Sequence, residues 1–249
     1  MKKRRLDELV VARGYSPSRT KAQALIMAGR VRHRTTIYDK PGKRVPEDLE
    51  IEIIEKARYV GRGGEKLDGL LECFPIDCTG KSILDVGAST GGFTDCLLQR
   101  GASAATCVDV GRGQLHEKLR GDARVTNLEK INARGLAEEH LPFEQYDIVT
   151  IDLSFISLRK VLASVWPRVG EAGFLIALIK PQFEATREEA DRGRGIIRDP
   201  EIIERITSEI RSFACSSLPE CRERTCVACE LPGRDGNREV FLVLQRAGA

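Results

Sequence analysis

The chain has 249 residues, of which 41% are hydrophobic and 31% are charged, and its formal net charge is +3 at pH 7. This composition is typical of a soluble globular protein, and the length allows two domains with a sizeable core. The longest apolar run, residues 174–179, is far shorter than the roughly 20 residues of a membrane helix. The charged N-terminus lacks the apolar segment of a secretory signal. We therefore expect a cytoplasmic protein and exclude a membrane-embedded one.

Basic residues are concentrated near the N-terminus. Residues 1–60 carry 15 Lys or Arg against 8 Asp or Glu, whereas the rest of the chain carries 25 against 29. A compact basic module joined to a slightly acidic body indicates a polyanion-binding domain attached to an enzyme. A solvated basic surface without a ligand is the alternative that charge alone leaves open.

The first part of the chain predicts a small, basic α+β domain. Apolar periodicity indicates helices over residues 4–13 and 18–28, each stopped by a glycine. Short strand patterns follow at 31–33, 36–37 and 51–54.

Residues 58–64 contain three glycines and two arginines, a composition that disfavours regular structure. We expect a basic domain over residues 1–57, a linker over 58–64 and a second domain over 65–249.

Strands and helices alternate in the second domain. Helical patterns occur at 65–73, 186–191 and 199–214. Seven strand cores are predicted at 82–86, 104–108, 124–128, 147–151, 172–179, 223–230 and 238–245. This alternation predicts an α/β fold, a Rossmann-like, mostly parallel seven-stranded sheet that binds ligands at the carboxyl ends of its strands. The last two strands are expected to form an antiparallel pair.

The first strand of this domain runs into a glycine-rich loop, Asp85-Val-Gly-Ala-Ser-Thr-Gly-Gly-Phe93. Glycines at a strand-to-helix turn let a ligand lie against bare backbone. The spacing differs from the Gly-x-Gly-x-x-Gly of pyrophosphate sites, which disfavours a nicotinamide dehydrogenase. An acid at the head of the loop suits a cationic or zwitterionic ligand such as S-adenosylmethionine. The candidate binding residues are Asp85, Gly87, Ala88, Ser89, Gly91, Gly92 and Phe93.

Two acids follow the next strands. Asp109 ends the second strand, about 20 residues beyond the first glycine, where a carboxylate accepts hydrogen bonds from both ribose hydroxyls of a nucleoside. Glu129, or Asn127, lies at the end of the third strand and is a candidate contact for the adenine. An ordinary solvated strand end is the alternative for each.

Two lysines and two further acids stand at strand or helix ends around the same loop. Asp152 follows the fourth strand core, and Lys180 ends an almost wholly apolar strand. Lys66 lies on the helix before the first strand, and Glu239 opens the last strand. We expect these four side chains to converge above the sheet, with Asp152 also close to the cofactor.

At these residues the chain resembles a known family. The four residues around the glycine loop are similar to the Lys-Asp-Lys-Glu tetrad of FtsJ-type ribose 2′-O-methyltransferases. Longer strings resemble the TlyA family of ribosomal RNA methyltransferases, some members of which are called haemolysins. The strings are Gly63-Gly-Glu-Lys-Leu67, Asp109-Val-Gly-Arg-Gly-Gln-Leu115, Asn132-Ala-Arg134, Asp152-Leu-Ser-Phe-Ile-Ser-Leu158 and Lys180-Pro-Gln-Phe-Glu184. Members carry an N-terminal S4 RNA-binding domain, which residues 4–54 resemble.

The resemblance implies S-adenosylmethionine-dependent 2′-O-methylation of a cytidine in ribosomal RNA, with this RNA or a ribosomal subunit as the partner. We expect Lys180 to act as general base and Lys66 to stabilise the developing alkoxide. Relatives that modify both subunits tend to be longer at both ends. The short ends here favour large-subunit (23S) RNA and leave small-subunit (16S) methylation open.

Six basic residues of the N-terminal domain are the candidates for contacts with RNA phosphates, which carry little sequence information. They are Arg4, Arg5, Arg19, Lys21, Arg30 and Arg32. In the second domain, Gly193-Arg194-Gly195 indicates either a mobile loop near the site or an ordinary exposed loop.

Two other functions compete with this reading: an RNA-binding ribosome-assembly factor without catalysis, and a haemolysin-like membrane-active protein. Cys221, Cys226 and Cys229 have a spacing that suits zinc. Their segment has the pattern of a strand, however, in which Cys226 and Cys229 point to opposite faces. We therefore predict no metal site, and the oligomeric state stays open.

Overall fold

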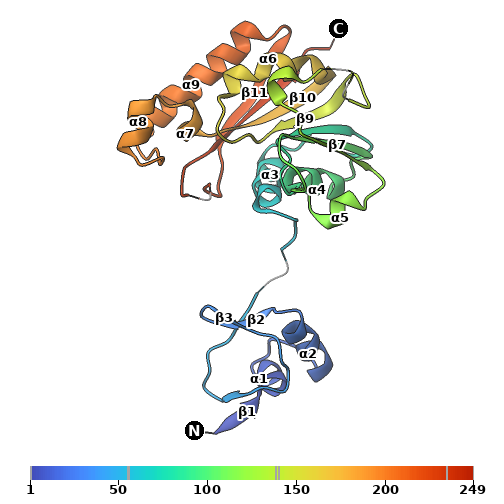
Figure 1. Cartoon of the computed structure of the whole chain (residues 1–249), viewed down its shortest axis with the longest axis vertical. Coiled ribbons are helices and arrows are strands. Elements are labelled where there is room, and N and C mark those ends of the chain that lie inside the picture. The colour runs from blue at the N-terminus through green and yellow to red at the C-terminus, as the bar shows by residue number, and fades with distance from the viewer. Residues whose placement is uncertain (1, 55–56, 138, 140, 234, 249) are drawn as a thin grey trace. The chain divides into compact units, whose positions relative to one another are not determined.

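The computed structural model describes residues 2–54, 57–137, 139, 141–233 and 235–248. The chain divides into two compact units, residues 1–57 and 58–249, which we call the N-terminal unit and the C-terminal unit (Figure 1).

The N-terminal unit packs two helices against two small antiparallel sheets. The helices are α1 (Leu6–Ala12) and α2 (Arg19–Met27). One sheet pairs β1 (Lys3–Arg5) with β4 (Arg44–Pro46), and the other has the order β3 (Thr36–Tyr38), β2 (Val31–His33) and β5 (Glu52–Ile53). The core consists of Leu6, Leu9, Val10, Ala22, Ile26, Val31, Val45 and Ile51. The predicted helices and three of the strands are confirmed. The other two, β1 and β4, escaped prediction because three-residue strands with charged side chains show no alternation.

The C-terminal unit is built on a seven-stranded sheet with the order β11-β12-β10-β9-β6-β7-β8. Five strands are parallel: β6 (Ser82–Val86), β7 (Ala104–Asp109), β8 (Val125–Glu129), β9 (Tyr146–Ile151) and β10 (Val169–Ile179). Antiparallel strands β12 (Val240–Arg246) and β11 (Cys221–Ala228) complete one edge. The predicted Rossmann-like sheet with a final antiparallel pair is confirmed.

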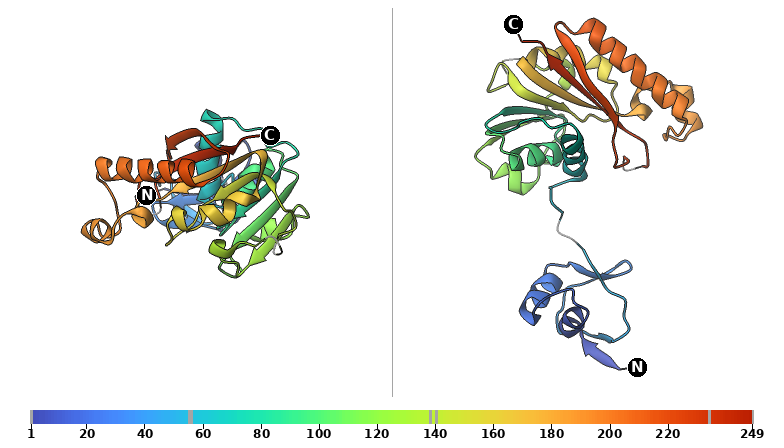
Figure 2. Two further views of the ribbon diagram at one scale, coloured as in Figure 1. Left: turned by 90° about the horizontal axis from the view of Figure 1, so that it is seen from above. Right: turned by 180° about the vertical axis from the view of Figure 1, so that it is seen from behind.

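Helices cover both faces of this sheet (Figure 2). One face carries α3 (Arg62–Cys73), α4 (Gly92–Gln99) and α5 (Glu117–Arg120), and the other carries α6 (Leu162–Val165) and α9 (Pro200–Ser217). Along β12, Phe241 and Val243 pack with the first group of helices, whereas Leu242 and Leu244 pack with the second. This alternation buries the strand on both faces, which explains its continuous apolar sequence.

The remaining helical segments are short. They are α7 (Pro181–Glu184), α8 (Arg187–Arg192) and the 3-10 turns η1 (Ala133–Gly135), η3 (Leu158–Lys160) and η4 (Trp166–Arg168). Among the helices of the described residues, none has both the length and the apolar character needed to cross a membrane.

The prediction of a linker over residues 58–64 is wrong, because α3 begins at Arg62. Tyr59 is only 3% exposed, and the backbone N–H of Val60 donates to Asp95 Oδ2 at 2.9 Å. The segment is therefore packed into the C-terminal unit.

The glycines of this segment serve close packing. A Cβ atom at Gly64 would lie 2.3 Å from Tyr59 Cβ, and one at Gly92 would lie 2.8 Å from the Gly64 nitrogen. Helices α3 and α4 thus approach each other through bare backbone at the end nearest the glycine loop. Composition alone does not distinguish this use of glycine from flexibility.

We predict opposite effects for two glycine substitutions on α3. Gly64→Ala should destabilise the C-terminal unit by about 1–3 kcal/mol, because the added methyl group overlaps the buried Tyr59. Gly69→Ala should stabilise it by about 0.5–1 kcal/mol, because a Cβ at Gly69 has no neighbour within 4 Å and alanine favours the helix. Urea unfolding, followed by the fluorescence of the single tryptophan, Trp166, measures both. Equal effects of the two substitutions would contradict the packing argument.

Candidate active site

The glycine loop lies where the strand order of the sheet reverses. From β6 the chain moves outward to β7 and β8, and it then continues on the other side of β6 with β9 and β10. Ligands of open α/β sheets bind at the carboxyl ends of the strands at such a point. There, the Asp152 N–H donates to the Val86 carbonyl oxygen at 3.1 Å, which extends the pairing of β6 and β9 up to the loop.

Two positions of the loop require glycine. Gly87 has a φ of +86°, and a Cβ there would lie 2.6 Å from the carbonyl oxygen of Asp152. Gly91 has a φ of +90°, and a Cβ there would lie 2.2 Å from Leu119 Cδ1. Any side chain at either position would both strain the backbone and clash.

Asp85, at the head of the loop, is fully buried. Its Oδ2 accepts hydrogen bonds from the N–H and the hydroxyl of Thr94 at 3.1 and 2.7 Å, and its Oδ1 accepts one from the Thr150 hydroxyl at 2.9 Å. Burial raises the pKa of Asp85 to about 6, against the opposing effect of these bonds. The carboxylate thus connects β6, β9 and the start of α4 beneath the loop.

Two adjoining cavities open at this edge of the sheet. The first, which we call the tetrad cavity, has a volume of about 680 Å³, and the second, the Asp109 cavity, about 560 Å³. Both are lined by Gly87, Ser89, Asp152, Ser154 and Phe155. A ligand that extends over the loop therefore reaches from one cavity into the other.

All four predicted catalytic residues line the tetrad cavity, and they form two ion pairs. Lys66 Nζ lies 2.5 Å from Glu239 Oε2, and Lys180 Nζ lies 2.6 Å from Asp152 Oδ1. Lys180 also donates to Ser154 Oγ at 3.3 Å. The side chains of Lys66 and Glu239 are 9% and 3% exposed, so this pair is held almost entirely within the protein.

The predicted cofactor residues are placed as follows. Asp85, Gly87, Ala88, Ser89, Gly92 and Phe93 line the tetrad cavity, and Asp109 lines the other. Gly91 lines neither cavity; it turns the chain into α4.

Two strand-end acids differ in position. Asp109 accepts hydrogen bonds from the N–H groups of Ser89 and Gly111 at 2.8 and 2.7 Å and faces its cavity. Glu129 does not line either cavity: its Oε1 accepts from the N–H of Gly113 at 2.8 Å. Residues 131–134, which follow β8, line the Asp109 cavity instead.

Several lining residues were not among the predicted site residues. Ser154, Phe155, Gln182, Phe183 and Asp235 line the tetrad cavity, and Val110, Gln114, Asn132 and Arg134 line the Asp109 cavity. Most of them lie in the strings that carried the family resemblance, which was the available signal. Polar side chains that lie two or more residues beyond the end of a strand have no distinctive sequence pattern of their own.

The predicted RNA-binding arginines are largely engaged within the N-terminal unit. Asp7 is fully buried and accepts hydrogen bonds from Arg5 at 2.9 and 3.1 Å, Arg19 at 3.1 Å and Gln23 at 2.8 Å. The Arg5 guanidinium is the main reason that the pKa of Asp7 lies well below its usual range. Asp7 therefore orients two arginines whose side chains are still 36% and 52% exposed.

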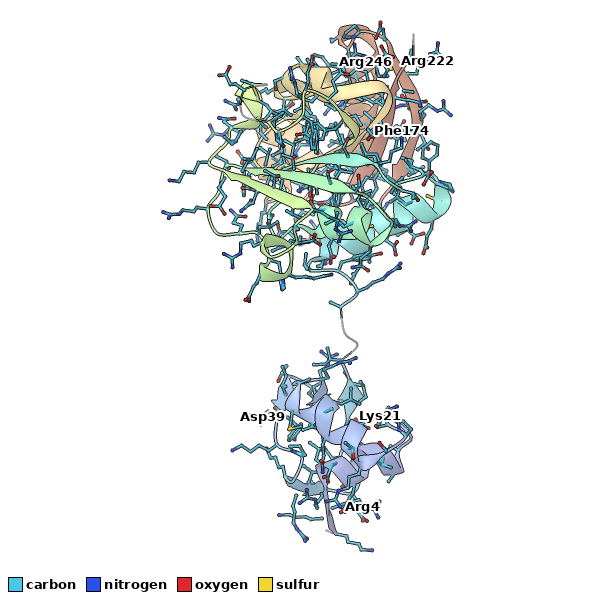
Figure 3. The ribbon with its side chains drawn as sticks, turned by 90° about the vertical axis from the view of Figure 1, so that its right-hand side faces the viewer. Arg4, Lys21, Asp39, Phe174, Arg222 and Arg246 are labelled. Atoms are coloured by element: carbon cyan, nitrogen blue, oxygen red, sulfur yellow. The ribbon has the colours of Figure 1, made fainter. Side chains whose placement is uncertain are left out.

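The other four basic candidates differ in their contacts. Arg4 pairs with Glu47 at 3.2 Å and Arg32 with Glu52 at 2.8 Å, and Arg30 donates to the carbonyl oxygen of Ile54 at 2.8 Å. Lys21, on α2, has no partner for its ammonium group among the described residues (Figure 3).

The cysteines are placed as the strand pattern predicts. Cys226 packs against the face of the sheet covered by α9, and Cys229 against the face covered by α3. Burial raises the pKa of Cys226 to about 11. Within the described part of the chain, no three His, Cys, Asp or Glu residues are grouped to hold a metal ion.

Two protein families match this chain. The FtsJ-like methyltransferase family matches residues 59–246, and the S4 domain matches residues 4–51. The chain belongs to the FtsJ-like methyltransferases. The cofactor predicted from the glycine loop, S-adenosylmethionine, is therefore confirmed.

Named relatives match over nearly the whole chain. The 16S/23S rRNA (cytidine-2′-O)-methyltransferase TlyA of Mycobacterium tuberculosis is 39% identical over 243 residues, which cover 97% of this chain and 89% of the relative. Hemolysin A of Brachyspira hyodysenteriae is 39% identical over 237 residues, 94% of this chain and 97% of the relative. The solved structure of a "Putative hemolysin from Streptococcus thermophilus" has 36% identity and a TM-score of 0.74, covering 99% of this chain and 90% of that one. The resemblance to the TlyA family is confirmed.

Proposed function

We propose that this protein is an S-adenosylmethionine-dependent ribose 2′-O-methyltransferase that modifies a cytidine of ribosomal RNA. The observation that carries the proposal is the pair of lysine–carboxylate contacts in one cavity beside the glycine loop. A ribose hydroxyl is a poor nucleophile near neutral pH, and its methylation needs a group that takes its proton.

The residues of the two cavities fit S-adenosylmethionine. Asp109 would accept the hydroxyls of its ribose, and the bare backbone around Gly87 would receive its amino-acid end beside the negative charge of Asp152. When bound, this cofactor supplies a methyl group activated by a positive sulfonium. Because the cavities adjoin over the loop, the methyl group would be presented toward the tetrad cavity.

Lys180 is the proposed general base. Its amine lies at the wall of the tetrad cavity, and Asp152 and Ser154 fix its direction at 2.6 and 3.3 Å. In its neutral form it accepts the proton of the ribose 2′-hydroxyl as the oxygen attacks. Positioning of the reacting groups contributes more to the rate than proton removal does, because oxygen, methyl carbon and sulfur must lie on a line.

Lys66 is proposed to stabilise negative charge on the attacking oxygen. The Lys66 side chain is only 9% exposed, so bulk water screens its positive charge little. Glu239 orients it through the 2.5 Å contact. The two lysines thus take different roles: Lys180 removes a proton, and Lys66 stabilises the negative charge that develops on the oxygen.

Ribosomal RNA as the substrate is supported by the S4 domain and by the names of the relatives. Cytidine is the nucleotide in the name of the mycobacterial relative, which includes both 16S and 23S RNA. We propose 23S RNA or the large subunit as the target, and the cytoplasm as the place of action. Methylation of 16S RNA in addition to 23S RNA is the alternative.

Replacing Lys180 with alanine should reduce methyl transfer by about 1,000-fold or more, because the proton acceptor is lost. Binding of S-adenosylmethionine, measured by calorimetry, should stay within about threefold. Incorporation of labelled methyl groups into ribosomal RNA measures the transfer. Lys160→Ala is the matched control, since Lys160 is an exposed lysine outside both cavities. Near-normal turnover of the Lys180 variant would refute the assigned role.

Lys21→Ala should lower the affinity for RNA and reduce the slope of log K against log salt by about 0.7–0.9, the value for one phosphate contact. Lys21→Arg should retain the slope. Filter binding to ribosomal RNA at several salt concentrations measures both variants. An unchanged slope for the alanine variant would show that α2 does not face the RNA.

A further inference from the structure

A buried asparagine connects two loops of the C-terminal unit that are distant in sequence. Asn237 is 1% exposed. Its Oδ1 accepts a hydrogen bond from the N–H of Ile197 at 2.9 Å, and its Nδ2 donates to the carbonyl oxygen of Gly195 at 3.0 Å. The side-chain amide thus accepts one hydrogen bond from, and donates one to, the backbone of the same segment.

That segment, residues 193–197, forms part of the wall of the tetrad cavity through Gly195. It is a tight turn: Arg194 and Gly195 have φ values of +51° and +81°, and the Ile196 N–H donates to Gly193 O at 3.0 Å. Such backbone is costly for a residue like arginine unless its surroundings fix it. The amide of Asn237 supplies two of the bonds that do so.

The segment that carries Asn237 leads directly to Glu239. Asn237 O accepts a hydrogen bond from the Gly233 N–H at 2.8 Å, which closes the turn. A Cβ at Gly233 would lie 2.7 Å from Glu239 Oε1, so the turn contacts the carboxylate itself. Glu239 in turn holds Lys66. A shift of this turn would therefore move one of the two ion pairs of the site.

We infer that Asn237 is a positioning residue for the methyl-transfer reaction: its amide fastens residues 193–197 to the turn before β12 and so fixes Glu239 and Lys66. The inference rests on the proposed function. Only an amide meets both requirements. Aspartate keeps the acceptor for Ile197 N–H but places a carboxylate against Gly195 O, and alanine removes both hydrogen bonds and leaves the N–H of the buried Ile197 without this acceptor.

Steady-state kinetics on ribosomal RNA and calorimetry with S-adenosylmethionine test the inference. We expect Asn237→Ala to lower kcat by about 10–100-fold, because displacement of a supporting group by about 1 Å has effects of this size. The kcat of Asn237→Asp should lie between those of Asn237→Ala and the wild type. The affinity for the cofactor should change less than about threefold in both variants. Tyr146→Phe is the control. It removes another buried hydrogen bond, 3.0 Å to Thr106, at the opposite end of the strands, and should leave kcat unchanged.

A double-mutant cycle with Glu239→Gln separates positioning from a general loss of stability. If Asn237 acts through Glu239, the effects of the two substitutions on kcat should be less than multiplicative. Multiplicative effects, or an equal loss of kcat in Tyr146→Phe, would overturn the inference.

Limited trypsin digestion gives a readout that does not depend on the proposed function. Arg194 and Arg198 are exposed on either side of the bonds to Asn237. Cleavage at these arginines should be at least about tenfold faster in Asn237→Ala than in the wild type or in Tyr146→Phe. An unchanged cleavage rate would overturn the inference even if the wild type proved inactive on RNA. A wild type inactive on RNA with faster cleavage of the variant would refute the proposed function alone.

Discussion

The contact between Lys66 and Glu239 is the interaction on which the site depends. It joins α3, at the start of the C-terminal unit, to the residue that precedes its last strand, 173 positions later in the sequence. An ion pair that is 9% and 3% exposed loses much of its solvation, and an apolar pair is often as stable. Its position in the wall of the tetrad cavity gives a reason for it: a fixed positive charge where the substrate oxygen would lie.

Several features of the fold keep this contact in place. Bare backbone at Gly64 and Gly92 allows α3, the helix that carries Lys66, to approach α4 closely. On the other side, the antiparallel return of β12 brings Glu239 to the same edge as the carboxyl ends of β9 and β10. Asp152 and Lys180 follow those two strands, so the two ion pairs line the same cavity.

Much of the fold was predictable, because strands buried on both faces are almost continuously apolar and stand out in the sequence. The tetrad was predictable for a related reason: Lys180 and Asp152 interrupt such runs at their carboxyl ends. Which acid pairs with which lysine was not predictable, since that depends on the crossover to β12.

The glycines at 61–64 were misread because composition does not tell close packing from flexibility. Glu129 occupies a strand end similar to that of Asp109, yet it faces the Gly113 turn. The buried Asp7 engages Arg5 and Arg19, a pairing that charge counts do not show.

The central claim is that an amine lies beside a sugar hydroxyl and an activated methyl group. The most direct measurement is nucleoside analysis by mass spectrometry of ribosomal RNA treated with the protein and isotope-labelled S-adenosylmethionine. The account predicts that the label appears in cytidine methylated at the ribose 2′-oxygen, which resists alkaline cleavage at that position. Label on a cytosine ring, or no label in the RNA, would contradict it.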